Sequence, residues 1–422
     1  MATVLIAALS PAGHAGPLLA VAEDLVCRGN RVTVMTGATH TAAIRVLGAR
    51  PHPLPADADP DASQRAARAG VDALNRAVIR PFLRSMAAQS TELDRALATE
   101  RYDAVLADHG FFGVLPLLLG DRPDGPPVLL YTTTPLMLSR RVLSGTAQRA
   151  TDRMLKSLGA GPLPVPLLDA GLLAQRLIVP TVESFEYPRS DLPDTVRFVG
   201  LVRPRPARRF TAPSWWPLLS AERPVVHVTQ GTVDNRDLTR LVGPTIAALA
   251  DEDVTVVVST GGRDVNAIGL PLPANTHAAE YIPHDRLLPR VDVVVTNGGY
   301  GAVQHALSAG VPCVVAGGTG DRPEVAARVA WSGAGIDLGT ATPTAAAVQD
   351  AVRRVRTEAG FLQNARRLEA AFARRDGVAE IAALLDEVIA ERAIATAGPP
   401  SRRKSSSGLR GCAGGPGERL RS

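Results

Sequence analysis

The fold of the second half of the chain is decided by residues 293–335, VVVTNGGYGAVQHALSAGVPCVVAGGTGDRPEVAARVAWSGAG. A short apolar run ends in a Gly-rich turn and an amphipathic stretch follows. A second apolar run then ends in a polar turn, GTGDRP, before another amphipathic stretch. This order predicts strand, turn, helix, strand, turn and helix, which is typical of a parallel sheet covered by helices. Both turns follow strands, so both lie at the carboxyl edge of the sheet, where ligands bind in such folds.

The first turn, NGGYG, has the composition of a phosphate-binding turn. Gly298, Gly299 and Gly301 would let backbone amides approach an anion closely. A helix that begins near Tyr300 would point its positive end at the same anion. A diphosphate suits this site. The alternative is that the glycines only form a tight turn between a strand and a helix.

The second turn places two polar side chains at the same edge of the sheet. Asp321 and Arg322 follow the strand that comes after the Gly-rich turn. A carboxylate and a guanidinium beside a bound diphosphate could hydrogen-bond the hydroxyls of a sugar.

Working outward, the second half reads as one α/β unit over residues 223–375. Further apolar runs in PVVHVTQGT, VTVVVSTGG and THAAEYIP alternate with helical sequence. A helix over 376–396 is predicted to pack back on the first unit, and residues 397–422 have the composition of a disordered tail. The Pro- and Arg-rich residues 203–222 read as an interdomain linker.

The first half, residues 1–202, reads as a second unit of the same kind. Residues 3–9 predict a buried strand, followed by a loop, an amphipathic helix and the β-branched run RVTVMTG. The segment PHPLPADADPDAS has turn chemistry, and a long helix is expected over 63–97. Further strands are predicted in DAVLA, PPVLLYTTTP, LIVPTV and VRFVGLV. The predicted fold class is α/β, with two Rossmann-like doubly wound domains that face a central cleft.

A histidine and an aspartate follow predicted strands of the first unit. His14 lies in the first strand-to-helix loop, and a neutral imidazole is suited to accept a hydroxyl proton near pH 7. Asp108 ends the strand DAVLA, where it could orient the imidazole and stabilise its protonated form. The alternatives are a plain loop histidine and an aspartate that caps the next segment, and His109 is a rival orienting group.

With these motifs, the chain resembles the family 1 glycosyltransferases of the GT-B fold, especially the bacterial macrolide and natural-product type. The resemblance covers residues 1 to about 393. In that family a His-Gly-Gly-x-Gly element binds the donor diphosphate, and an acidic residue, a Pro and an Asp-Gln pair follow. The matching positions here are Asn297, Gly298, Gly299, Gly301, His305, Pro312, Asp321 and Arg322.

Three of these positions depart from the family pattern. Asn297 replaces the phosphate-binding histidine; its carboxamide can donate a hydrogen bond but carries no charge. His305 stands where an acidic residue often contacts the ribose, and Arg322 stands where Gln often contacts the hexose. Because Asn297 carries no charge, we predict that donor binding is retained but weaker than with a histidine at this position.

The resemblance also suggests three further donor contacts. Tyr281 or Ile282 would meet the nucleobase, with a core aromatic at a strand end as the alternative. Thr232, in TQGT, matches a small hydroxyl residue near the donor phosphates, although a plain helix cap explains it equally well.

The implied reaction is an inverting transfer of a hexose or deoxyhexose from a UDP- or dTDP-sugar, with His14 as the base and without a metal or cofactor. Asp57 and Asp59 form an Asp-x-Asp pattern, which in other transferases holds a divalent ion. Their loop is rich in Pro and lies in the other half of the chain from the predicted diphosphate site. A solvated turn is therefore the preferred interpretation.

The acceptor pocket is predicted from apolar residues near His14 and Asp108. An apolar natural product would suit such a lining, although the same residues could form core. The predicted acceptor contacts are Leu83, Met86, Phe111, Phe112 and Leu136.

Charge and cysteine content narrow the remaining possibilities. The net charge of +5 resides largely in the tail after residue 400, so a broad nucleic-acid-binding face is not indicated. Three widely spaced cysteines fit no disulfide framework, and no apolar stretch approaches 20 residues, so a cytoplasmic protein without a membrane span is expected. The remaining alternatives are an auxiliary protein that binds a sugar nucleotide and a sugar-nucleotide epimerase, which would need no second substrate. The sequence does not decide the oligomeric state.

Overall fold

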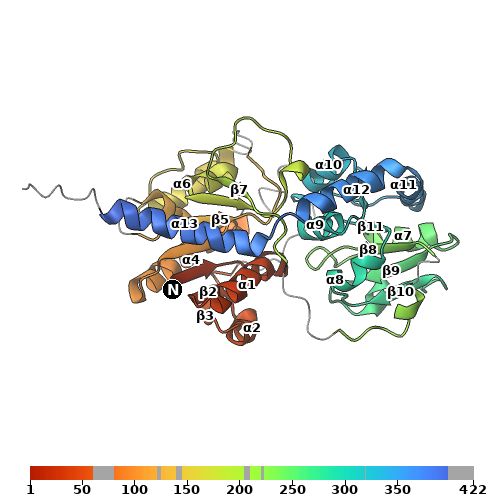
Figure 1. Cartoon of the computed structure of the whole chain (residues 1–422), viewed down its shortest axis with the longest axis horizontal. Coiled ribbons are helices and arrows are strands. Elements are labelled where there is room, and N and C mark those ends of the chain that lie inside the picture. The colour runs from red at the N-terminus through yellow and green to blue at the C-terminus, as the bar shows by residue number, and fades with distance from the viewer. Residues whose placement is uncertain are drawn as a thin grey trace, which may run out of the picture.

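The computed structural model describes residues 1–59, 80–120, 125–138, 145–203, 210–219, 223–318 and 320–397. Two parallel sheets, each covered by helices, are built from the first and second halves of the chain (Figure 1). The predicted α/β fold class with two sheets is thereby confirmed. The predicted helix over 63–97 is described only from residue 80, and most of the predicted tail lies outside the described residues.

The first sheet has seven strands in the order β3-β2-β1-β4-β5-β6-β7, and all neighbours are parallel. The strands are β1 (Thr3–Ala7), β2 (Arg31–Gly37), β3 (Arg50–Leu54), β4 (Ala104–Asp108), β5 (Val128–Tyr131), β6 (Arg176–Val179) and β7 (Val196–Phe198). The helices described with it are α1 (Ala12–Cys27), α2 (Thr41–Val46), α4 (Arg80–Thr99), α5 (Leu115–Leu119) and α6 (Gly145–Ser157).

The edge strand β3 corrects the sequence analysis, which predicted turn chemistry for its residues. Pro51 and Pro53 lie within it, opposite Val34 and Thr36 of β2. Proline lacks a backbone N–H, but an edge strand pairs on one side only and can leave that position unpaired. The two prolines made this segment look like a turn in the sequence, but an edge strand tolerates them.

The second sheet has six parallel strands in the order β10-β9-β8-β11-β12-β13. The strands are β8 (Val225–Thr229), β9 (Thr255–Ser259), β10 (Thr276–Ala279), β11 (Val293–Thr296), β12 (Cys313–Val315) and β13 (Gly335–Asp337). The accompanying helices are α7 (Val242–Leu249), α8 (His284–Leu287), α9 (Tyr300–Ser308), α10 (Arg322–Trp331), α11 (Ala345–Thr357) and α12 (Ala359–Phe372).

Central strands are buried on both faces, which is why they read as continuous apolar runs. In β1, Val4 and Ile6 belong to one core cluster, while Leu5 and Ala7 belong to the cluster on the opposite face. Side chains alternate between the faces of a strand, so both faces of the first sheet carry a core.

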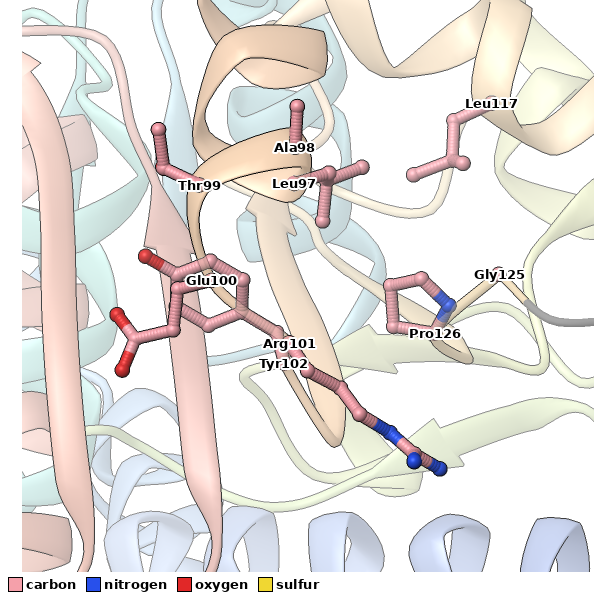
Figure 2. A pocket seen from close by; sticks show the side chains of 9 residues that line it. All are labelled: Leu97, Ala98, Thr99, Glu100, Arg101, Tyr102, Leu117, Gly125 and Pro126. Carbon is pink, nitrogen blue, oxygen red and sulfur yellow. The ribbon is translucent and has the colours of Figure 1, made fainter.

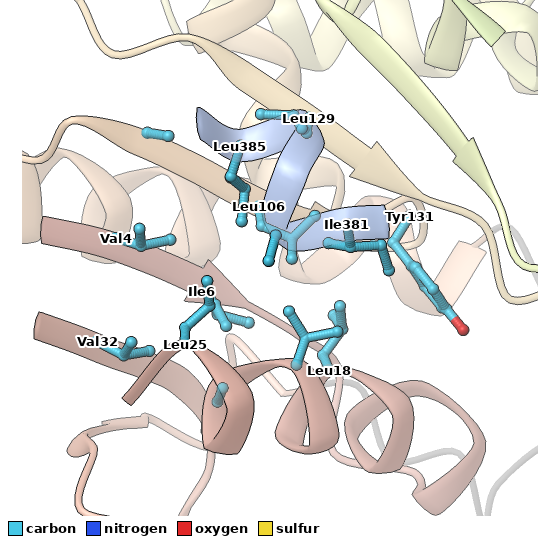
Figure 3. Close-up of a cluster of buried hydrophobic side chains, with 14 of the residues drawn as sticks. Val4, Ile6, Leu18, Leu25, Val32, Leu106, Leu129, Tyr131, Ile381 and Leu385 are labelled. Atoms are coloured by element: carbon cyan, nitrogen blue, oxygen red, sulfur yellow. The ribbon is translucent and has the colours of Figure 1, made fainter. Parts of the chain in front are cut away.

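The final helix, α13 (Gly377–Ala397), crosses from the second unit to the first. Ile381 and Leu385 point into the core cluster that contains Val4 and Ile6 (Figure 3). The helix contacts α1, and Arg176 at the start of β6 pairs with two of its glutamates. The core of the first unit is thus completed by a helix from the C-terminal part of the chain. Among the described helices, none is long and apolar enough to cross a membrane.

Candidate functional site

The structure brings the predicted base and its partner together at the carboxyl edge of the first sheet. Because β1 and β4 are neighbours, His14 in the first turn of α1 lies beside Asp108 at the end of β4. His14 Nδ1 lies 2.6 Å from Asp108 Oδ2. The His14 side chain is 15% exposed, whereas Asp108 is fully buried. The arrangement leaves the far side of the ring, which carries Nε2, as the side able to meet a substrate.

Asp108 is held in place as a carboxylate. Burial alone would raise the pKa of Asp108, but His14 and His109 together hold it well below its usual range. The carboxylate also accepts hydrogen bonds from the backbone N–H groups of Gly110 (2.9 Å) and Leu9 (3.4 Å). Asp108 therefore contacts both the imidazole of His14 and the backbone of a local turn.

Thr133, which the sequence analysis did not single out, lies next to this pair. Its hydroxyl is 3.4 Å from His14 Nδ1, and its backbone N–H donates to His109 Nδ1 at 3.3 Å. Thr133 follows β5, the neighbour of β4, within the Thr run of PPVLLYTTTP. That hydroxyl run at a strand end was the signal that could have found it. His109 Nδ1 lies 3.4 Å from Asp108 Oδ1, so His109 contacts Asp108 and Thr133.

The Gly-rich turn at the end of β11 depends on its glycines for its backbone conformation and its packing. Gly298 adopts a φ of 83°, a left-handed conformation that favours glycine. A Cβ there would lie 2.9 Å from Val315 Cγ1 and 3.3 Å from the Cβ and carbonyl oxygen of Arg322. Gly299 is the N-cap of α9, and Gly301 has open space where a Cβ would stand. The turn thus packs tightly against α10 on one side and is open on the other.

Asn297 is buried at the start of this turn. Its Nδ2 donates to the carbonyl oxygens of Gln230 (2.8 Å) and Asp234 (3.4 Å). The carboxamide therefore links the Gly-rich turn to the loop after β8. A histidine at this position would have to replace those two hydrogen bonds.

Arg322 reaches the same loop from the other side. Its Nη1 lies 2.9 Å from Asp234 Oδ2, and Asp234 also pairs with Arg240 at 3.3 Å. A small pocket between these groups is lined by Gln230, Asp234, Arg240, Leu241, Asn297, Ala316, Gly318, Arg322 and Ala341. Two guanidinium groups therefore lie beside the Gly-rich turn, and both pair with the carboxylate of Asp234. Asp234 was missed because its loop has no recognisable motif.

The other predicted donor residues lie at different depths. Thr232 is exposed in the loop after β8, and Tyr281 is 65% exposed after β10. Ile282, by contrast, belongs to the core of the second unit. Asp321 is the N-cap residue of α10 and is half-buried.

His305 lies half-buried in α9, with its ring 4.7 Å from that of His284. Burial, together with the charges of His284 and Arg203, lowers the pKa of His305 to about 3. His305 is consequently neutral at physiological pH and can act as a hydrogen-bonding group without charge.

The predicted acceptor residues pack largely as core. Phe111 and Leu136 belong to one cluster of the first unit, and Leu83 and Met86 belong to another. Phe112 is half-buried and packs against both clusters. Their part in an acceptor pocket stays a prediction.

The two aspartates of the Asp-x-Asp pattern have different surroundings in the structure. Asp57 is exposed, whereas Asp59 accepts hydrogen bonds from the hydroxyl (2.8 Å) and backbone N–H (3.4 Å) of Ser10. Asp59 thus tethers the loop that precedes His14, and this half of the pattern is not the solvated turn expected. No group of three or more His, Cys, Asp or Glu residues in the described ranges could hold a metal ion.

A cavity of about 390 Å³ lies elsewhere, at the end of α4 (Figure 2). Arg101 and Tyr102 precede β4, and Pro126 precedes β5, so the cavity opens at the amino edge of the first sheet. Asp108 lies at the opposite edge. The cavity therefore belongs to no part of the candidate site.

Comparison with known proteins identifies the family. The chain is 37% identical to 4'-demethylrebeccamycin synthase of Lentzea aerocolonigenes over 92% of this chain and the whole of that protein. A family model described as erythromycin biosynthesis protein CIII-like, C-terminal domain, matches residues 244–388. The chain belongs to the EryCIII-like family of natural-product glycosyltransferases. The protein is accordingly a glycosyltransferase that uses a nucleotide sugar, as the sequence analysis predicted.

Solved structures agree with the fold. The glycosyltransferase of kitacinnamycin superposes with a TM-score of 0.74 at 22% identity, covering 92% of this chain and 98% of that one. The spinosyn rhamnosyltransferase superposes with a TM-score of 0.72 at 22% identity, covering 92% and 100%. The latter has been solved with thymidine diphosphate and with the spinosyn aglycone. The GT-B resemblance stated from the sequence is confirmed.

Proposed function

We propose that this glycosyltransferase catalyses an inverting transfer of a hexose or deoxyhexose to a hydroxyl of an apolar natural product, without a metal ion. His14 takes the proton of the acceptor hydroxyl as its oxygen attacks the anomeric carbon. The bond from that carbon to the diphosphate breaks in the same step, and the nucleoside diphosphate leaves. A single displacement of this kind inverts the anomeric configuration.

The observation that carries the proposal is the contact between His14 and Asp108. A buried carboxylate 2.6 Å from Nδ1 fixes the imidazole so that Nε2 is unprotonated and available as a base. It also stabilises the imidazolium that forms when the proton arrives. The low pKa of Asp108 keeps the carboxylate charged across the physiological range.

The donor diphosphate is assigned to the carboxyl edge of the second sheet. The turn at Gly298 and Gly299 and the amino end of α9 supply backbone donors to an anion. Arg322 and Arg240, which share the single carboxylate of Asp234, supply guanidinium donors beside the turn. Tyr281, exposed after β10, is the candidate to stack on the nucleobase, and Asp321 is the candidate to hydrogen-bond the sugar.

Metal independence is supported by what surrounds the proposed diphosphate. The charges of two arginines and of a helix amino terminus can stabilise a departing diphosphate in place of a divalent cation. Asp59, the candidate metal ligand, is committed to Ser10 in the other unit. These contacts favour a reaction that proceeds with all divalent ions chelated.

Two features of relatives guide the choice of substrates. One relative is named for the synthesis of 4'-demethylrebeccamycin, and the spinosyn enzyme is a rhamnosyltransferase solved with thymidine diphosphate. We therefore propose a polycyclic or polyketide-derived acceptor and rank dTDP-deoxysugars beside UDP-glucose as donors.

The test is the anomeric configuration of the product, which is determined by NMR. The reaction is run with and without EDTA to test whether it needs a metal ion. UDP-glucose and several dTDP-deoxysugars are offered with a panel of phenolic, indolocarbazole and macrolide acceptors. The proposal predicts a product whose anomeric configuration is opposite to that of the donor, formed at an unchanged rate with EDTA. A product that retains the configuration, or a rate abolished by EDTA and restored by Mg²⁺, would contradict it.

A further inference from the structure

A buried ion pair joins the two units of the molecule close to both halves of the proposed site. Arg328 in α10 donates from Nε to Glu186 Oε2 at 2.6 Å. Glu186 follows η6 (Glu183–Phe185), the short helix after β6 in the first unit. The two side chains are 3% and 4% exposed. Burial of both charges makes the geometry of this contact strict, because neither group can be satisfied by water.

The pair also holds the loop after β5. Glu186 Oε1 accepts from the backbone N–H of Leu136 at 3.0 Å, and Arg328 Nη2 donates to the Leu136 carbonyl at 3.0 Å. One residue of this loop is therefore bound through both its backbone groups. Three residues earlier in the same loop, Thr133 lies 3.4 Å from the imidazole of His14.

In the second unit, the amino end of α10 lies at the proposed donor site. The helix begins at Arg322, which pairs with Asp234 beside the Gly-rich turn, and Arg328 lies six residues further along. At about 1.5 Å per residue, those six residues span about 9 Å of rigid helix. A shift of Arg328 relative to Leu136 would therefore move Arg322 relative to His14.

Neighbouring contacts fix the orientation of Arg328. Its guanidinium carbon lies 4.6 Å from the centre of the Tyr187 ring, which in turn meets Trp331 edge-on at 5.3 Å. Glu324, one turn earlier in α10, accepts from Nη1 at 3.0 Å. The arginine is therefore held by charge, hydrogen bonds and an aromatic face at once.

We propose that Arg328 and Glu186 are positioning residues for glycosyl transfer, which set the donor sugar against the base through α10 and the loop at Leu136. The proposal rests on the assignment of His14 as the base and of the donor to the second sheet. Because both side chains are almost fully buried, we assign the pair an indirect role rather than contact with a substrate. Its effect is on the alignment of the two reacting groups, to which displacement reactions are sensitive.

The experiment compares Glu186→Gln, Arg328→Lys and the double variant Glu186→Leu/Arg328→Met with wild type. Replacing both charges with apolar side chains of similar size preserves folding in other buried pairs, so the double variant separates positioning from stability. The control is Arg354→Met, which removes an exposed ion pair of α11. Three quantities are measured: acceptor-dependent transfer, slow donor hydrolysis without acceptor, and the Kd of the nucleoside diphosphate by calorimetry.

The proposal predicts that kcat for transfer falls about tenfold or more in all three variants. The Kd of the nucleoside diphosphate and the hydrolysis rate stay within about twofold of wild type, so the ratio of transfer to hydrolysis falls. Unchanged transfer in the double variant would overturn it. So would an equal loss of transfer, hydrolysis and nucleotide binding, which indicates a structural role. Failure of the proposed function is distinguishable, because wild type would then show no transfer that depends on His14.

Discussion

Asp108 and His14 lie 94 residues apart in the chain, yet the pairing of β1 with β4 places their side chains in contact. The charge of Asp108 is the property that this contact requires, since the neutral amide of asparagine has the same shape without it. Two substitutions at this position can therefore separate shape from charge.

Asp108→Asn is expected to lower the transfer rate by about 10²-fold or more, because the amide neither fixes the reactive tautomer nor stabilises the imidazolium. Asp108→Ala should lose at least as much. The rate of acceptor-dependent nucleoside diphosphate release measures both. A loss of only a few fold in Asp108→Ala would remove the carboxylate from the mechanism.

Asn297 stands at the position where the resembling family has a histidine that binds the donor phosphates. Asn297→His is expected to tighten binding of the nucleoside diphosphate about tenfold, because a protonated imidazole adds a charge-assisted hydrogen bond. Asn297→Ala is the matched control and should weaken binding, since it removes the link to Gln230 without adding charge. Calorimetric titration with UDP and dTDP measures the Kd values. An Asn297→His protein that binds equally or more weakly would contradict this account.

At the scale of single elements, the Gly-rich turn depends on one backbone conformation. Gly298→Ala is expected to destabilise the protein by about 1–3 kcal/mol and to weaken donor binding, because alanine at a φ of 83° is strained and its Cβ meets Val315. Gly301→Ala is the control, since its Cβ would meet open space. Urea denaturation compares the free energies of unfolding. Equal stability of the two variants would show that the turn can relax.

Strand β8 carries a buried histidine that makes stability depend on pH. Burial, with a contribution from His284, lowers the pKa of His227 to about 3. His227 Nε2 bonds Ser259 at 2.9 Å, and Nδ1 has no hydrogen-bond partner among the described residues. Below its ordinary pKa of about 6.5, the unfolded chain binds a proton that the folded chain excludes. The free energy of unfolding therefore falls as the pH falls from 6.5 toward 3.

The expected loss from His227 is about 1.4 kcal/mol per pH unit across that window, as an upper bound. His227→Gln should remove this contribution, so the variant loses less stability than wild type between pH 7 and pH 4.5. Urea denaturation at the two pH values measures the difference. Equal losses in both proteins would mean that His227 does not titrate as described.

The elements themselves were largely predictable, for a physical reason. Strands such as β1 and β11 are buried on both faces and so read as unbroken apolar runs with a turn behind them. The edge strand β3 was missed because its prolines signal turns. The short strand β13 was missed because three residues carry no pattern. The site contacts of Thr133, Asp234 and Arg328 were missed because they depend on loops and helices meeting across distant parts of the chain.

At the scale of the whole molecule, helix α13 from the C-terminal part of the chain packs into the core of the first unit. Leu385→Ala is expected to destabilise that unit by about 2–5 kcal/mol, because it leaves a cavity in a packed core. Ile394→Ala, at a position 75% exposed, is the control and should leave stability within about 0.5 kcal/mol. Thermal unfolding of the two variants tests whether α13 supports the fold in solution. Similar melting temperatures would contradict the packing described here.

Removal of residues 398–422 tests whether the positively charged C-terminal tail contributes to activity. The tail holds most of the positive excess but has no stacking aromatics, so it is not expected to bind nucleic acid or substrate. Truncation after Ala397 should leave kcat and KM for donor and acceptor unchanged. A large loss of activity would assign the tail a role that its composition does not suggest.

We propose that the two halves of the molecule supply different parts of the reaction, with the base His14 in the first unit and the donor-binding turn in the second. The most direct measurement is nucleoside diphosphate release by wild type and His14→Ala, with and without acceptor and with EDTA present. His52→Gln, a change on the edge strand β3, is the control. The account predicts release that needs the acceptor and falls about 10²- to 10⁴-fold in His14→Ala, with the Kd of the nucleoside diphosphate unchanged. Acceptor-dependent release at the wild-type rate in His14→Ala would show that another group takes the proton.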